Sequence, residues 1–166
     1  MALFGNIEDN IIELFKSLVD DKDFLRLLSI DSPDCMSQEP TSTFYELFNN
    51  RLEMKPKVIT PTTEESTFVS IWLRNNTKSD SNNIYQYDSI IMVDIMCHLN
   101  LWLINGNKIR PYRMVDLIEQ NFRDVKIKGI RGTMNLQDNS FMQYSGNFMG
   151  YRLIYKYTGT LGRQSV

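Results

Sequence analysis

The chain has 166 residues, of which 42% are hydrophobic and 23% are charged, and its formal net charge is -2. These values are typical of one folded domain and exclude an intrinsically disordered chain. The weakly acidic balance argues against nucleic acid as the main ligand, because phosphate binding depends on clustered Lys and Arg side chains.

Three features of the sequence predict the compartment of the chain. Cys35 and Cys97 lie far apart and lack the spacing of metal ligands, which favours a reduced, intracellular environment. Residues 1–6 do not have the pattern of a signal peptide. The apolar run 90–102 is interrupted by polar residues, whereas a membrane span needs about 20 apolar residues. We therefore expect neither secretion nor membrane insertion.

The first third of the chain predicts helices followed by an irregular connector. Asn6 is the predicted N-cap of a helix in which apolar residues recur at helical spacing as far as Leu18. A second apolar cluster at 24–28 is expected to continue or restart this helix after a bend. The Ser, Asp and Pro content of 29–40 favours a loop.

The middle of the chain predicts a short helical turn and two strands. Thr43 and Glu46 match a capping box. The β-branched and aromatic residues of 67–74 predict the first strand, and 75–83, which has no apolar residue, is expected to be a solvated loop. Alternation over 91–102 predicts a second strand. One of its faces should pack on the helices, and the other should meet water or a neighbouring subunit.

The last third predicts one helix and two further strands. A turn at 105–107 precedes a helix with Pro111 at its first position. Residues 125–137 and 146–158 are expected to form strands, joined by a turn that contains residues 138–140.

Together these elements predict one α+β domain over residues 1–158, with the order α-β-β-α-β-β. Adjacent strands with short links pair in an antiparallel manner, and helices with one apolar stripe cover the same sheet face. We therefore expect an antiparallel sheet of about four strands with helices packed on one face. Residues 159–166 are expected to be a flexible C-terminal tail, because they have little to pack.

No pattern in the sequence matches a known catalytic, cofactor or metal-binding motif. His98 is the only histidine, and along a strand it would lie about 13 Å from Asp94, too far to share a metal or a proton. Gly129–Gly132 lacks the spacing of a phosphate-binding loop. We expect no enzymatic activity and no cofactor. Two alternatives stay open: a small-ligand- or nucleic-acid-binding α+β module, and an enzyme that uses Asp88, Asp94 or tyrosines in a cleft.

Several side chains are candidates for contacts with other proteins. The predicted turn before residue 146 places apolar groups where a monomer would expose them, and arginines gather around the second main helix. The candidate interface residues are Arg74, Trp102, Arg110, Arg113, Arg131, Phe141 and Met142.

Three parts of the chain share a layout with a known family. They are the segment Asp94–His98, the helix that opens at Arg110–Pro111 and the last strand with Tyr151–Tyr155. Over roughly residues 60 to 158, the chain resembles the tail terminator and related neck, or head-tail joining, proteins of tailed bacteriophages. Its longer N-terminal helical region departs from the compact members, which leaves open another position in the neck.

The resemblance implies a subunit without enzymatic role that closes into a homo-oligomeric ring, usually a hexamer. Such a ring caps the tail tube and joins it to the head connector, so the expected partners are further copies, tail-tube proteins and connector or neck proteins. The expected location is the virion neck or tail, after synthesis in the bacterial host cytoplasm. DNA would pass through the pore without sequence-specific contact, and no membrane would be involved.

Overall fold

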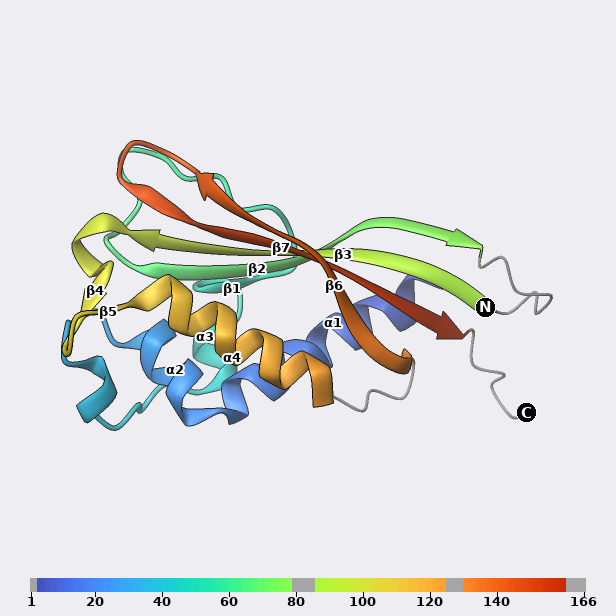
Figure 1. Cartoon of the computed structure of the whole chain (residues 1–166), viewed down its shortest axis with the longest axis horizontal. Coiled ribbons are helices and arrows are strands. Elements are labelled where there is room, and N and C mark those ends of the chain that lie inside the picture. The colour runs from blue at the N-terminus through green and yellow to red at the C-terminus, as the bar shows by residue number, and fades with distance from the viewer. Residues whose placement is uncertain (1–2, 79–85, 125–129, 161–166) are drawn as a thin grey trace.

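Two layers make up the part of the chain that the computed structural model describes, residues 3–78, 86–124 and 130–160 (Figure 1). The helices are α1 (Leu3–Asp20), α2 (Lys22–Ser29), α3 (Phe44–Leu47) and α4 (Arg110–Asp124). The strands are β1 (Leu52–Glu53), β2 (Thr67–Lys78), β3 (Gln86–His98), β4 (Leu103–Ile104), β5 (Lys108–Ile109), β6 (Ile130–Gln143) and β7 (Phe148–Thr160). Two short 3-10 helices, η1 (Cys35–Ser37) and η2 (Leu99–Leu101), complete the elements.

Local signals in the sequence explain where the helices begin. Asp21 accepts hydrogen bonds from two backbone amides in the first turn of α2, so the helix restarts there as predicted. Thr43 and Glu46 form the predicted capping box of α3. Pro111 lies in the first turn of α4. The predicted N-cap Asn6 was wrong, because the helical spacing of apolar residues already begins at Leu3 and α1 begins with it.

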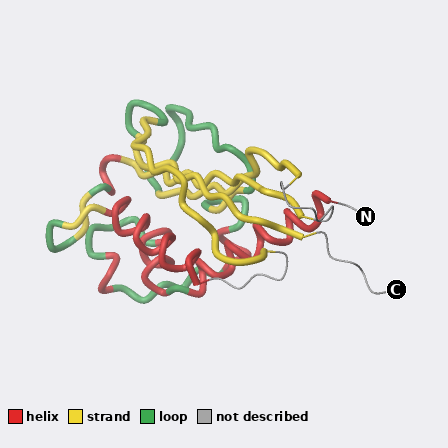
Figure 2. The backbone as a smooth tube through the Cα atoms, turned by 45° about the vertical axis from the view of Figure 1, so that its right-hand side comes forward, coloured by secondary structure: helices red, strands yellow, loops and turns green. Residues whose placement is uncertain are grey.

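The sheet has the order β1-β2-β3-β7-β6. The four long strands pair in an antiparallel manner, which confirms the predicted sheet, and β1 adds a short parallel pairing of Leu52 and Glu53 with β2. The helices cover one face, as Figure 2 shows from a second direction. The α+β prediction is therefore confirmed, although the complete sheet is mixed rather than purely antiparallel.

Some predicted boundaries in the second and third quarters were wrong. Residues 75–78 continue β2 instead of starting a loop, and residues 79–85 lie outside the described part. Polar side chains are tolerated there because this end of β2 is a sheet edge facing water. Strand β3 ends at His98, whose Nδ1 accepts a hydrogen bond from the Asn100 amide and starts η2.

The C-terminal boundaries differ as well. Residues 138–140, predicted as a turn, lie inside β6, and the chain reverses between β6 and β7. Their polarity suits an edge strand, which meets water along its free side. Residues 125–129 of the predicted strand lie outside the described part. The predicted tail begins too early, because β7 includes residues 159 and 160, and residues 161–166 lie outside the described part.

The helix-facing side of the sheet forms the main core, as predicted. Ile91, Val93 and Ile95 of β3 are fully buried against the helices, together with Leu153 and Tyr155 of β7. This arrangement follows from strand alternation, because every second side chain of β3 points to the helical layer.

The opposite side of β3 is also buried, which contradicts the prediction that it meets water or a neighbour. Met92, Asp94, Met96 and His98 are each at most 6% exposed. A second cluster covers one end of this side, with Phe68, Met96 and Phe148 at its centre and Ile59 and Tyr144 packed against them. The segments that carry Ile59 and Tyr144 lie outside helices and strands, so no periodic pattern in the sequence predicts that they cover the sheet.

One glycine is required where β3 and β7 meet. A Cβ atom on Gly150 would lie 1.8 Å from the backbone oxygen of Ile95, far inside van der Waals contact. Gly150 pairs with Met96 in the antiparallel ladder, so the two backbones approach closely at this point. The absence of a side chain is what permits this pairing.

Candidate protein-interaction site

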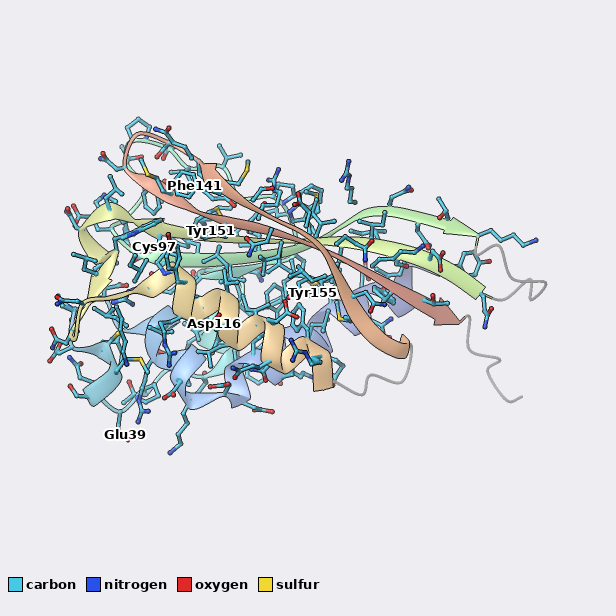
Figure 3. All side chains as sticks on the ribbon, viewed as in Figure 1. Glu39, Cys97, Asp116, Phe141, Tyr151 and Tyr155 are labelled. Atoms are coloured by element: carbon cyan, nitrogen blue, oxygen red, sulfur yellow. The ribbon has the colours of Figure 1, made fainter. Side chains whose placement is uncertain are left out.

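Four aromatic side chains from four parts of the chain form a continuous row, here called the aromatic row. Its members are Trp102 after η2, Phe141 of β6, Tyr151 of β7 and Tyr112 of α4. The ring centroids of Trp102 and Phe141 lie 6.4 Å apart, those of Phe141 and Tyr151 5.8 Å, and those of Tyr151 and Tyr112 5.4 Å. All three contacts are edge-to-face, the geometry that the ring quadrupole favours. Figure 3 shows Phe141 and Tyr151 near the start of α4.

The aromatic row is open to solvent at two of its members. Phe141 is 54% exposed and Tyr112 is 49% exposed, whereas Trp102 and Tyr151 are partly buried. Exposed aromatic rings that touch one another are unusual on a monomer and are typical of protein interfaces. The row can therefore bury further apolar area when a partner covers it.

Arg110, at the start of α4, fixes one end of the site from inside the protein. Its side chain is fully buried. Nε donates to the Leu101 oxygen at 2.9 Å, Nη1 donates to the Leu27 and Ile30 oxygens at 2.6 and 2.9 Å, and Nη2 donates to the Ser32 oxygen at 2.7 Å. Arg110 thus joins the end of α2 and the connector after it to the segment that carries Trp102.

The backbone completes this connection. The Arg110 amide donates to the Trp102 oxygen at 2.8 Å. No described carboxylate forms an ion pair with Arg110. Backbone carbonyl dipoles stabilise the positive charge instead. The carbonyl groups of Leu27 and Ile30 belong to the C-terminal end of α2, where the helix dipole is negative. A buried cation is tolerated here because its donors are satisfied by backbone oxygens.

A second buried group, Asp94, orders the middle of the row. Arg152 donates to its two oxygens at 2.6 and 2.9 Å, Trp72 Nε1 donates at 3.2 Å, and Tyr144 donates at 3.1 Å. The Tyr144 hydroxyl also lies 3.2 Å from the Tyr151 backbone oxygen. This network crosses β2, β3 and β7 and reaches the end of β6, so it holds the strands that carry Phe141 and Tyr151.

The tyrosines of these networks are held in the neutral form. Burial raises the pKa of Tyr151 from 10.0 to about 12, and the hydroxyl of Tyr112 adds to this effect. Burial, followed by the Asp94 carboxylate, also raises the pKa of Tyr144. Neutral phenols suit an apolar contact surface, because covering a phenolate would cost much more desolvation free energy.

The structure brings some of the predicted interface residues together and separates others. Trp102 and Phe141 touch, and Met142 follows Phe141 in β6 with a partly buried side chain. Arg110 is buried, so its side chain is not part of the surface that the sequence suggested. Arg74 lies exposed in β2, and Arg113 is partly buried in α4.

The backbone of Arg131 lies in β6, and its side chain is outside what the structure describes. Two members of the row were not predicted as interface residues. These are Tyr151 of β7 and Tyr112 of α4. Their link to Phe141 depends on the crossing of α4 over the sheet, which no local spacing reveals.

The residues considered for an enzymatic alternative have structural contacts. Asp94 is 2% exposed and accepts the four hydrogen bonds described above. His98 is 6% exposed, and its ring packs edge-to-face on Phe148 at 5.0 Å. Asp88 pairs with Lys156 at 2.9 Å. Among the described residues, no group of three or more His, Cys, Asp or Glu side chains is placed to hold a metal ion.

Both cysteines are buried as free thiols. Burial raises the pKa of the Cys97 thiol from 9.0 to about 11, and burial also raises the pKa of Cys35. A thiol with a raised pKa is a poor nucleophile at neutral pH, because the thiolate is the reactive form. These thiols therefore serve as small core residues.

Comparison with known proteins identifies the family. A family model described as YomW matches residues 21–157, which includes every member of the aromatic row. A comparison with curated proteins found no match. Within the described residues, no helix is long and apolar enough to cross a membrane. The family is named after a gene of a Bacillus phage region. The chain therefore belongs to the YomW family, and this membership associates it with a phage.

Proposed function

We propose that this chain is a structural subunit of a phage neck or tail ring, and more specifically a tail terminator. In this role it caps the tail tube and joins it to the head connector, and it makes and breaks no covalent bond. The observation that carries the proposal is the aromatic row, a preformed and half-exposed contact surface on the described part of the chain.

The free energy that the aromatic row can contribute on burial supports a protein contact. Fully burying a Phe side chain contributes about 1.5–3 kcal/mol, so covering the exposed half of Phe141 contributes about 1 kcal/mol. Interface free energy concentrates in a few aromatic and arginine side chains surrounded by weaker contacts. Four touching rings, together with their neighbours, are sufficient to form such a centre.

The rigidity of the row supports the same conclusion. Arg110 fixes the segment of Trp102, and the Asp94 network fixes the strands of Phe141 and Tyr151. A surface that is already ordered loses little conformational entropy on binding. Long-lived assemblies benefit from such preorganisation, because less of the contact free energy is spent on ordering.

The choice of a neck or tail ring rests on two further points. Membership of the YomW family associates the chain with a phage. The layout resemblance of residues 60 to 158 to tail terminators supports the position that we propose within the particle. Expected partners are further copies of the chain, the tail tube and the head connector.

The test is a binding experiment with Phe141→Ser and Tyr45→Ser as a matched pair. Tyr45 is 86% exposed and lies in α3, outside the aromatic row. We expect the wild-type chain to co-elute with purified tail-tube or connector proteins in size-exclusion chromatography with light scattering. Phe141→Ser should weaken this complex by about fivefold, since a loss of about 1 kcal/mol corresponds to that factor, and Tyr45→Ser should leave it unchanged.

Two outcomes would refute the proposal. Equal weakening by both variants would remove the aromatic row from the contact. A chain that binds neither partner, stays monomeric and is stabilised by a small ligand or an oligonucleotide would favour the alternative of a ligand-binding or nucleic-acid-binding module.

A further inference from the structure

The sheet ends in two different edges. Strand β6 is its last strand on one side. On the other side β1 pairs only with Val69 and Ser70, so within the described residues no strand pairs with β2 from Ile71 to Lys78 on the side away from β3. A free edge presents backbone N–H and C=O groups that can pair with another chain.

The β6 edge is regular where it is best placed for pairing. From Asp138 to Gln143 it pairs residue by residue with β7 and has no bulge. The Tyr144 amide donates to the Phe148 oxygen at 2.9 Å, so this backbone N–H group points toward β7. Because backbone groups alternate along an antiparallel strand, the amides of Asn139, Phe141 and Gln143 point away from the sheet. Phe141, a member of the aromatic row, therefore also belongs to the free edge.

The described charged side chains on the two edges are opposite in sign. Arg74 and Lys78 on the β2 edge are exposed and form no ion pair with another described residue. Asp138 on the β6 edge is exposed and accepts a hydrogen bond from Ser140 of its own strand. Pairing two β2 edges would bring four cations together, whereas pairing β2 with β6 brings acid to base.

Strand directions favour the same combination. Neighbouring strands alternate in direction across β2-β3-β7-β6, so β2 and β6 run in opposite directions. When two copies lie side by side with the same sheet orientation, β6 of one copy meets β2 of the next in an antiparallel manner. Leu73 of β2 and Phe141 of β6 both lie on the helix-facing side of their strands. The new pair would therefore bring apolar side chains to the same face.

We propose that the β6 edge of one copy pairs with the β2 edge of a second copy and continues the sheet from subunit to subunit. This inference rests on the proposed function, and it adds the contact through which copies associate. The contact is head-to-tail, with two different surfaces, which is the kind of interface that closes into a ring.

The experiment uses two variants of the full chain, each with one blocked edge. Asn139→Pro removes an outward amide of β6, and proline is tolerated at an edge strand; Asn139→Ala, which keeps this amide, is its matched control. The double variant Arg74→Glu with Lys78→Glu makes the β2 edge acidic. Circular dichroism and thermal melts check that each variant is folded.

Association is measured by native mass spectrometry and sedimentation velocity over a concentration series. We expect the wild-type chain and Asn139→Ala to associate, and each blocked variant alone to stay monomeric. An equimolar mixture of the two blocked variants should give a heterodimer, because one supplies an intact β2 edge and the other an intact β6 edge.

Other results would overturn the inference. Wild-type chains that remain monomeric over the whole series would refute it. Loss of association with Asn139→Pro, without an effect of the β2 variant and without recovery in the mixture, would indicate pairing of two β6 edges. Binding of the wild-type chain to tail-tube or connector proteins is measured separately, so the proposed function can stand when this contact fails.

Discussion

Arg110 connects distant parts of this protein by itself. A single guanidinium bonds to backbone oxygens of residues 27, 30, 32 and 101, and its own amide holds Trp102. A planar group with five donors suits several carbonyls at fixed angles, whereas the compact ammonium of lysine does not. The positive charge is thereby used for architecture rather than for contact with a partner.

Replacing Arg110 should destabilise the fold strongly. Arg110→Ala leaves buried carbonyl groups without donors, so we expect a loss of about 3–5 kcal/mol in the free energy of unfolding. Arg110→Lys should recover only part of this loss. The control is Arg113→Ala, a partly exposed residue in the same helix, which should change stability by about 0.5 kcal/mol or less. Urea unfolding monitored by circular dichroism measures the difference. Equal effects of the two alanine variants would contradict the structural role of Arg110.

The tyrosines make the stability of the folded protein fall at high pH. Burial raises the pKa of Tyr151 from 10.0 to about 12, and burial also raises the pKa of Tyr144 and Tyr155. A raised pKa means that folding favours the neutral phenol, so this contribution to stability is complete below pH 10 and is lost as the pH rises toward 12 and beyond.

We expect the free energy of unfolding to fall above about pH 10, with a smaller fall in Tyr151→Phe, which has no proton to lose. Phenolate absorbance of the folded protein measures the titration, and urea unfolding at each pH measures the stability. Titration of every tyrosine near pH 10 in the folded state would contradict the assigned burial.

At the scale of elements, β3 and β7 form the centre of the sheet, and Gly150 sets how closely they approach. Gly150→Ala would place a methyl group against the Ile95 backbone oxygen, which cannot move without separating the strands. We expect a loss of about 1–3 kcal/mol or more in the free energy of unfolding. Gly146→Ala is the control, because a Cβ atom there meets nothing within 4 Å. If thermal melts show the same stability for both variants, the close approach of β3 and β7 is wrong.

Elements with a clear period were predictable from the sequence. The alternation over β3 and the apolar stripe of α4 correctly predicted a strand and a helix, and the capping box of α3 was correct to the residue. The turn predicted at residues 138–140 was wrong because polar residues also suit an edge strand. Buried polar side chains such as Asp94 could not be foreseen, since their partners come from segments far away in sequence.

The aromatic row was predictable only in part for a similar reason. Phe141 was a candidate because it lies beside a predicted turn, where apolar groups are expected to be exposed. Trp102 lies on the face of the strand predicted over 91–102 that was expected to meet water or a neighbour. Tyr112 and Tyr151 lie within regular elements, and they join the row only because α4 crosses the sheet next to β7. Arg110 had the pattern of a surface arginine, and its burial depends on the packing of α2 against α4.

At the scale of the whole molecule, the proposed contact surfaces gather around the sheet. The aromatic row lies where η2, α4, β6 and β7 meet, and the β2 edge lies on the other side of the same sheet. A subunit with two different surfaces can contact two neighbours at once. Contacts between complementary protein surfaces are thus the proposed basis of its function.

The most direct test of this account is to measure the copy number of the chain in purified phage particles. Quantitative mass spectrometry against the portal protein gives this number. We expect the chain in intact virions at a small, fixed number of copies per particle, as one ring requires. Its absence from virions, in infected cells that nevertheless produce it, would contradict a role as a structural subunit of the neck or tail.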